Sequence, residues 1–112
     1  MSQVVQEAGG SNCAVYRFVG ELDALTAQRL RQVLARMASS PKAVIDLSEV
    51  VFIDSTGLNA LVGGIRRIRE CGGQVAVSSS SPQVRRLLTL TGFEKIVLLA
   101  DSVDEAAGKL AD

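Results

Sequence analysis

The strongest constraint on the fold is an alternation of short, β-branched aliphatic runs with longer stretches whose apolar residues have helical spacing. The strand-like runs are CAVYRFV at 13–19, KAVIDL at 42–47, QVAV at 74–77 and KIVLL at 95–99. The stretches with helical spacing occupy 22–37, 58–68, 84–91 and the residues from Ser102 to about Leu110. This alternation implies right-handed β-α-β crossovers, so the sequence predicts an α/β domain with a mainly parallel or mixed sheet.

Residues with special backbone preferences mark the ends of the expected helices. Gly72 and Gly73 follow the second helical stretch, as expected for a C-terminal cap, and Gly92 follows the third. Ser81 precedes a proline that suits the first helical position, so it is expected to cap the third helix. Ser102 is expected to cap the last helix in the same way. At the N-terminus, VVQEA is expected to pair with 13–19 through the turn-prone GGSN at 9–12.

Length and composition predict one soluble domain and exclude several functions. The 112 residues fit a single domain over 1–112, in which residues 1–12 are either partly disordered or an edge strand. Twelve basic and twelve acidic side chains give a net charge of zero, and aromatic residues are few, which argues against nucleic-acid binding. The chain has no bilayer-length apolar run and no signal-peptide pattern, so we expect a cytoplasmic protein without membrane insertion.

The chain contains no histidine, which argues against most enzymatic functions and most metal sites. Histidine is the commonest general base and the usual partner of a Ser or Cys nucleophile. We therefore expect no catalytic residues, no metal site and no cofactor. The two cysteines, Cys13 and Cys71, are far apart in the sequence, and both are interpreted as small core residues.

The segment FIDSTGLNAL at 52–61 places a carboxylate, two hydroxyls and a glycine between a strand-like run and a helix. Asp54 or Ser55 at this junction can cap the helix, which alone explains the residue types. The same geometry also suits a phosphorylation site at Ser55, because a phosphate there meets the positive end of the helix dipole. Phosphorylation adds about −1.5 to −2 charges and can release a partner without unfolding the domain. Local geometry leaves both readings open.

Motifs spread over the chain decide between them. In order, they are GELDALTAQRLRQVL at 20–34, AVIDLSEVVFIDSTGLNALV at 43–62, GGQVAV at 72–77, SPQVRRLLTLTGFEKIV at 81–97 and SVDEAA at 102–107. Together they resemble bacterial anti-sigma factor antagonists, the single-domain members of the STAS family. The likeness runs from about residue 13 onward. Each motif is only moderately specific, and their order and spacing make the resemblance strong.

The resemblance implies a four- or five-stranded mixed β-sheet covered by about four helices, with no catalytic activity. It also implies an anti-sigma factor partner with a kinase-type ATP-binding fold. When the antagonist binds it, that partner releases a sigma factor. The same partner phosphorylates the first hydroxyl of the D-S-[ST]-G-L motif, which is Ser55 here, and a serine phosphatase reverses the modification.

Other residues around Ser55 are assigned to the partner-binding and phosphorylation loop. By resemblance, Asp23 lies near this loop, although it also opens the first helical pattern and can be a cap. Thr56 is either a secondary acceptor or a hydrogen-bond donor at the helix start. Gly57 is expected to serve backbone shape or close approach, and Leu58 and Asn59 to join the partner surface.

For two of the residues around Ser55, a structural interpretation stands beside the functional one. Asp54 is either a helix cap or an orienting group for the serine hydroxyl, and the two roles are compatible. Leu58 is alternatively plain core. The arginines at 66, 67 and 69 are interpreted as a solvated helix face.

Two rival functions are considered. Small STAS proteins also occur as accessory subunits of ABC-type lipid transporters and within stress-sensing assemblies, and the serine motif does not exclude these uses. An enzyme with Ser55 as its nucleophile is disfavoured, because no G-x-S-x-G or S-x-x-K pattern surrounds the serine. The chain also lacks the G-x-x-x-x-G-K-[ST] pattern of a nucleotide-binding loop.

Overall fold

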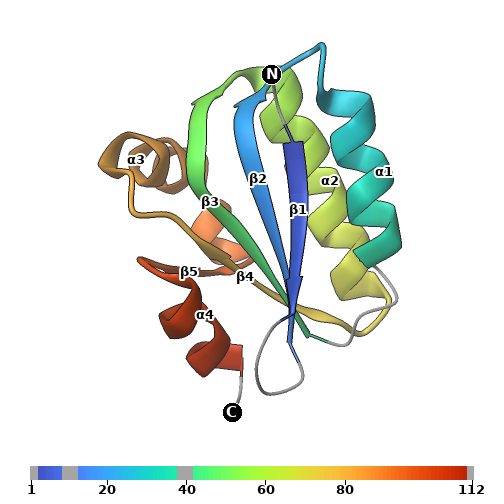
Figure 1. The fold of residues 1–112 in the computed structure, drawn as a ribbon, viewed down its shortest axis with the longest axis vertical. Coiled ribbons are helices and arrows are strands. Elements are labelled where there is room, and N and C mark those ends of the chain that lie inside the picture. Colours follow the sequence, from blue (N-terminus) through green and yellow to red (C-terminus); the bar gives the residue numbers. More distant parts are fainter. Residues whose placement is uncertain (1–2, 9–12, 38–41, 111–112) are drawn as a thin grey trace.

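A computed structural model describes residues 3–8, 13–37 and 42–110 of the chain. In this part of the chain, five strands form one sheet in the order β1-β2-β3-β4-β5. The strands are β1 (Gln3–Ala8), β2 (Ala14–Leu22), β3 (Lys42–Ile53), β4 (Gln74–Ser78) and β5 (Leu98–Ala100). β1 is antiparallel to β2, and the other neighbouring pairs are parallel, so the expected mixed α/β sheet is confirmed (Figure 1).

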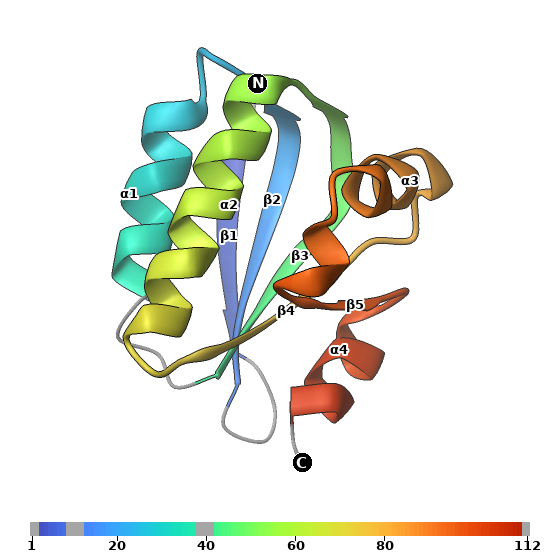
Figure 2. The same ribbon diagram turned by 180° about the vertical axis from the view of Figure 1, so that it is seen from behind.

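Within the described residues, four α-helices and one short 3₁₀ helix connect or follow the strands. They are α1 (Ala27–Met37), α2 (Ser55–Glu70), α3 (Pro82–Leu90), the 3₁₀ helix η1 (Phe93–Lys95) and α4 (Val103–Leu110). The helices α1 and α2 lie side by side over one face of the sheet, which Figure 2 shows from that side. α4 packs against β3, β4 and β5 on the opposite face (Figure 1).

The sheet separates two apolar clusters of unequal size. The larger cluster contains buried side chains of α1, α2 and α3, and among its largest members are Phe18, Leu34, Ile45, Leu61, Ile65 and Leu88. The smaller one lies under α4 and includes Cys13, Val44, Ala106 and Leu110. Most of the apolar surface that stabilises the fold is therefore buried on the α1/α2 face of the sheet.

The ends of the helices confirm the capping residues expected from the sequence. The Ser81 hydroxyl accepts a hydrogen bond from the Val84 N–H at 3.3 Å, and the Ser102 hydroxyl accepts one from the Glu105 N–H at 3.1 Å. Gly72 and Gly92 have φ values of 87° and 77°, a conformation that glycine adopts without steric cost. The turn expected at residues 9–12 lies outside the described residues.

Three expectations about single elements are wrong. Leu22 ends β2 and Leu25 lies in the following loop, so the first helix begins later than the apolar spacing predicts. KIVLL at 95–99 is not one strand, because η1 occupies its start and β5 covers only Leu98–Ala100. Cys13 is buried as expected, but Cys71 is exposed at the end of α2.

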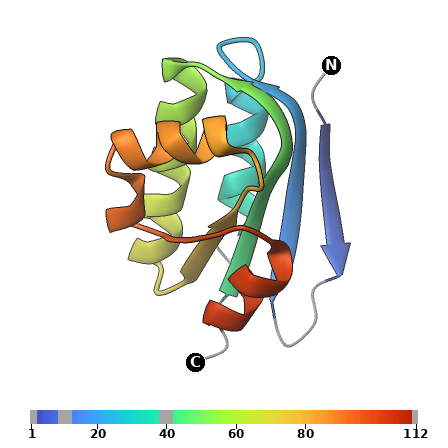
Figure 3. The same ribbon diagram turned by 90° about the vertical axis from the view of Figure 1, so that its left-hand side faces the viewer.

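β3 is longer than its neighbour β4. It pairs with β4 only over Lys42–Asp46, whereas it pairs with β2 as far as Ile53. Beyond Asp46, the helix α3 lies beside β3, as the views in Figures 1 and 3 agree. Buried Val84 and Leu88 of α3 belong to the same apolar cluster as Leu47 and Val50 of β3. α3 therefore lies along the part of β3 that does not pair with β4.

A polar cluster of buried Asp46, buried Ser78 and exposed Ser48 lies where β3 and β4 separate. One carboxylate oxygen of Asp46 accepts hydrogen bonds from the Ser48 N–H at 2.9 Å and from the Ser48 hydroxyl at 2.7 Å. The buried Ser78 hydroxyl of β4 donates to the same oxygen at 3.3 Å. Asp46 thus joins the two strands through side-chain bonds at the last residue pair of their ladder.

Candidate functional site

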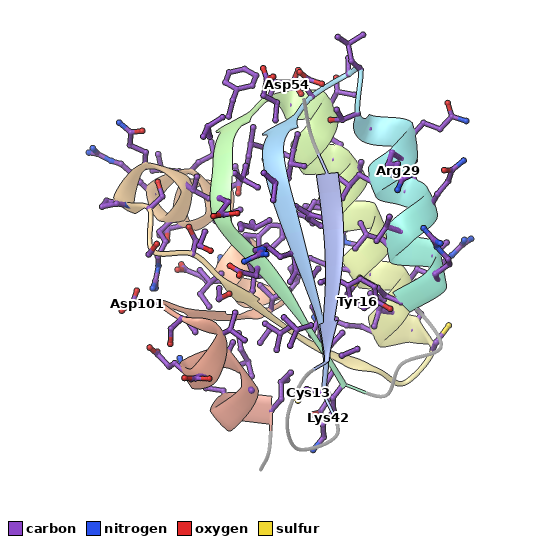
Figure 4. The ribbon with its side chains drawn as sticks, in the orientation of Figure 1. Cys13, Tyr16, Arg29, Lys42, Asp54 and Asp101 are labelled. Atoms are coloured by element: carbon purple, nitrogen blue, oxygen red, sulfur yellow. The ribbon has the colours of Figure 1, made fainter. Side chains whose placement is uncertain are left out.

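The candidate site lies at the carboxyl ends of the neighbouring parallel strands β2 and β3. Leu22 and Ile53 are the last residues of these strands and are paired. One residue further on, the Asp54 N–H donates a hydrogen bond to the Leu22 carbonyl at 3.0 Å. Asp54 lies at the end of the sheet opposite Cys13 and Lys42, as Figure 4 shows. The parallel pairing therefore brings Asp23 and Asp54, far apart in the sequence, to one edge of the molecule.

Asp54 is the N-cap of α2. Its backbone is extended, and one carboxylate oxygen accepts a hydrogen bond from the Gly57 N–H at 2.9 Å. This bond satisfies one of the N–H groups that the start of a helix leaves without a partner. The negative charge also lies at the positive end of the helix dipole. Of the two compatible roles considered for Asp54, the structure contains the capping one.

Gly57 is buried where α2 approaches the end of β2. A Cβ atom built at this position would lie 2.0 Å from the Leu22 carbonyl oxygen and 3.0 Å from the Asp23 nitrogen. The expectation that glycine is needed here for close approach is confirmed. The contact also holds the first turn of α2 beside the loop that carries Asp23.

Asp23 organises the loop between β2 and α1. Its carboxylate accepts hydrogen bonds from the N–H of Leu25 at 3.0 Å and of Thr26 at 3.2 Å, and the Thr26 hydroxyl accepts one from the Asp23 N–H. The first residue of α1 is Ala27, so Asp23 closes a turn before the helix and does not cap it. This turn holds Asp23 next to Gly57.

The first residues of α2 differ in exposure. Ser55 and Asn59 are exposed, and Thr56 and Leu58 are half-buried. Leu58 packs against the main apolar cluster, in agreement with its alternative interpretation as core. Ser55 is the first residue of α2, so its hydroxyl is accessible at a helix N-terminus.

Three apolar residues with unusual exposure were missed as site candidates. Leu25 is 93% exposed in the loop after Asp23, and Val51 and Phe52 near the end of β3 are 78% and 50% exposed. Exposed large apolar side chains that gather at one end of a molecule mark interaction surfaces. Leu25 follows Leu22 at helical spacing, so the sequence pattern gave no sign of its exposure.

The segments that form the site are acidic. Residues 20–26 and 50–59 contain Glu21, Asp23 and Asp54 and have no basic residue. We call the surface formed by Asp23, Leu25, Phe52, Asp54 and Ser55 the serine surface. Its acidic and apolar character favours a partner that offers basic and apolar groups.

Within the residues that the structure describes, His, Cys, Asp and Glu form no group of three or more that could hold a metal ion. None of the helices in the described ranges is both long and apolar enough to cross a membrane. The chemistry available at this site is that of one exposed hydroxyl beside two carboxylates.

Comparisons with known proteins agree with this geometry. The STAS domain family matches residues 4–106. The chain is 31% identical over 99 residues to an anti-sigma F factor antagonist of Paenibacillus polymyxa, a match covering 86% of this chain and 85% of the relative. It is 32% identical over 94 residues to an anti-sigma-B factor antagonist of Listeria monocytogenes, with 82% of each chain covered.

A solved structure matches over the full length. The crystal structure of an anti-sigma factor antagonist from Mycobacterium paratuberculosis superposes with a TM-score of 0.89 at 31% identity, covering 100% of this chain and 96% of that one. The family match spans nearly the whole described chain, including the strand ends that carry Asp23, Asp54 and Ser55. This chain belongs to the STAS domain family.

Proposed function

We propose that this protein is an anti-sigma factor antagonist whose binding is controlled by phosphorylation of Ser55. Without the phosphate, the serine surface binds an anti-sigma factor that has a kinase-type ATP-binding fold, and a sigma factor is released. The phosphorylated form does not bind, and a serine phosphatase restores the active form. The similar antagonists of Paenibacillus and Listeria support the partner class.

The observation that carries the proposal is the exposure of Ser55 at the start of a capped helix. A kinase needs a hydroxyl that protrudes from the surface, and Ser55 is exposed while the neighbouring Thr56 is half-buried. The free N–H groups at the start of α2 favour a phosphate electrostatically, so modification leaves the fold intact. Ser55 is therefore the acceptor in this proposal.

The phosphoryl transfer itself is simple. The Ser55 oxygen attacks the γ-phosphorus of ATP, a new O–P bond forms, and the bond from that phosphorus to the β–γ bridging oxygen breaks. ADP leaves, and the serine proton passes to a base of the kinase. This chain contributes the exposed hydroxyl of the first residue of α2, a helix whose start Asp54 caps.

In this proposal, electrostatic repulsion is the reason that the phosphorylated protein leaves the kinase. Phosphorylation adds about −1.5 to −2 charges to a surface that already contains Glu21, Asp23 and Asp54. In the complex, the new phosphate faces the remaining negative phosphates of the nucleotide in the kinase. Like charges brought together in an interface cost several kcal/mol, which converts a stable complex into a weak one.

The test is a pull-down from native lysate with three baits: wild type, Ser55→Asp and Ser102→Asp. Ser102 is the matched control, because it also lies at the start of a helix and aspartate can cap there. We expect wild type and Ser102→Asp to retain a protein with a kinase-type ATP-binding fold, and Ser55→Asp to lose it. Purified, this partner should phosphorylate wild type with ATP and leave Ser55→Ala unmodified, as measured by mass spectrometry.

Two results contradict the proposal. In the first, Ser55→Asp retains the kinase as well as wild type does. In the second, all baits retain subunits of a lipid transporter and no kinase, which favours the transporter role. Phosphorylation at Thr56 in Ser55→Ala would move the switch to the second hydroxyl of the motif.

A further inference from the structure

A pocket lies at the end of the molecule away from Ser55. It has a volume of about 540 Å³ and forms where the end of α2, the start of β4, the η1 segment and the end of α4 meet. α2 has 16 residues, so this end lies about 24 Å along the helix from Ser55. Gln74 of the pocket pairs with Lys42, which Figure 4 labels at the end of the sheet opposite Asp54.

The charged residues of the pocket are mainly basic. Arg69, Lys95 and Lys109 line it, with Glu94 as the one acidic residue among the lining residues. The chain as a whole has no net charge. Glu105, which does not line the pocket, forms an ion pair with Lys109 at 3.7 Å, so the local excess of positive charge comes mainly from Arg69 and Lys95. This excess favours an anionic ligand.

Two of the basic groups are held in place by backbone carbonyls. The Arg69 guanidinium donates to the Ile96 carbonyl at 3.0 Å, and the Lys109 ammonium donates to the Leu99 carbonyl at 2.9 Å. A guanidinium has five N–H donors and an ammonium has three, so one such bond leaves donors for a ligand. The positions of these groups are thus fixed before any ligand binds, which reduces the entropy lost on binding.

The C-terminal end of α2, which is the negative end of the helix dipole, repels an anion less strongly than the end of an uncapped helix would. The carbonyls of Arg67, Ile68 and Arg69 accept hydrogen bonds from the backbone N–H groups of residues 71–73. These bonds give the three carbonyl oxygens hydrogen-bond partners within the backbone. These three carbonyls therefore contribute less negative potential to the pocket than unpaired carbonyls would.

The remainder of the pocket is apolar. Buried Val75, Val97 and Leu110 form part of its lining, and Leu98 of the edge strand β5 is 44% exposed beside them. Pockets that bind small molecules typically have volumes of about 300–1,000 Å³ and combine an apolar lining with a few fixed polar groups. This pocket has both properties.

We propose that the pocket binds a small amphipathic anion, with a carboxylate or phosphate group among Arg69, Lys95 and Lys109 and an apolar chain against Leu98. Such a ligand is either a free metabolite or the end of a membrane lipid, since both offer the same chemistry. The proposal does not depend on the phosphorylation of Ser55.

The test uses the ¹⁵N-labelled full-length chain and NMR titration with four probes: octanoate, octyl phosphate, inorganic phosphate and octanol. We expect octanoate and octyl phosphate to give saturable shifts centred on residues 69–75, 94–98 and 109–110. Inorganic phosphate has no apolar chain and octanol has no charge, so both should bind at least tenfold more weakly.

Matched variants separate binding in the pocket from general attraction. Lys95→Gln and Leu98→Gln should each weaken octanoate at least fivefold, and their spectra outside the pocket should remain those of the folded wild type. Arg86→Gln and Leu90→Gln remove the same kinds of group from exposed positions on α3, so octanoate affinity should not change.

Flotation with phosphatidylglycerol vesicles distinguishes the two sources of the ligand. Octanoate binding without flotation indicates a free metabolite, and binding with flotation that Leu98→Gln abolishes indicates a lipid. The proposal is overturned if no probe saturates at these residues, if octanol binds as tightly as octanoate, or if inorganic phosphate alone binds equally well. The proposal is also overturned if Arg86→Gln weakens octanoate binding as much as Lys95→Gln does.

Discussion

At Gly57 the first turn of α2 lies against the backbone at the end of β2. The space for a side chain is taken by the Leu22 carbonyl, 2.0 Å from where a Cβ atom would be. A carbonyl in a sheet cannot move as a flexible side chain can, so a methyl group must push the helix away. The same displacement would separate Ser55 from the loop of Asp23.

We predict that Gly57→Ala lowers the free energy of unfolding by about 2–3 kcal/mol, as overpacking in a tight core does. Gly63→Ala is the matched control in the same helix, since nothing lies within 4 Å of its Cβ position. It should raise stability by about 0.5–1 kcal/mol, because alanine is the better helix former. Urea unfolding followed by circular dichroism measures both values. Equal stability of the two variants would show that α2 shifts freely.

Among the elements, those with strong local signals were predictable from the sequence. Caps at Ser81 and Ser102 and the helix start at Asp54 depend on neighbours three residues away, so the sequence contains their whole cause. The end of β2 at Leu22 depends on pairing with Ile53, which is distant in the sequence. Helical spacing of leucines could not reveal that partner.

Strand lengths and surface positions at the site depend on tertiary neighbours. β5 has three residues because it pairs with Ala76–Ser78 at the end of β4. The exposure of Leu25 and Phe52 likewise depends on how far the loop and β3 extend beyond the helices. The acidic and hydroxyl residues of the site were therefore foreseen, and the apolar ones around them were not.

At the scale of neighbouring elements, Asp46 connects β3 and β4. We predict that Asp46→Ala lowers the free energy of unfolding by about 2–3 kcal/mol, because it leaves the buried Ser78 hydroxyl without its acceptor. Ser78→Ala removes only one long hydrogen bond and should cost about 1 kcal/mol or less. Urea unfolding compares the two variants. A smaller cost for Asp46→Ala than for Ser78→Ala would contradict this role.

For the whole molecule, the two apolar clusters imply unequal local stability. α2 buries Gly57, Ala60, Leu61, Ile65 and Ile68 in the larger cluster. α4 buries Ala106 and Leu110 in the smaller one. The free energy needed to open a segment increases with the apolar surface that opening exposes.

We predict that native-state hydrogen exchange separates the molecule into two units. Amides of α4 should exchange through an opening with lower free energy than that of α2, by at least about 1 kcal/mol. The experiment is exchange at increasing, non-denaturing concentrations of urea, followed residue by residue by NMR. If α4 and α2 open with the same free energy and the same urea dependence, the domain opens as one unit.

The unequal lengths of β3 and β4 have a consequence for self-association. Beyond Asp46, one side of β3 has no strand from β4, and a strand with an open side offers N–H and C=O groups that a strand of another molecule can pair with. α3 lies along that side and packs its buried Val84 and Leu88 against the same core. This helix therefore prevents a strand of another molecule from extending the sheet. A destabilising substitution in α3 is expected to cause aggregation before it causes loss of partner binding.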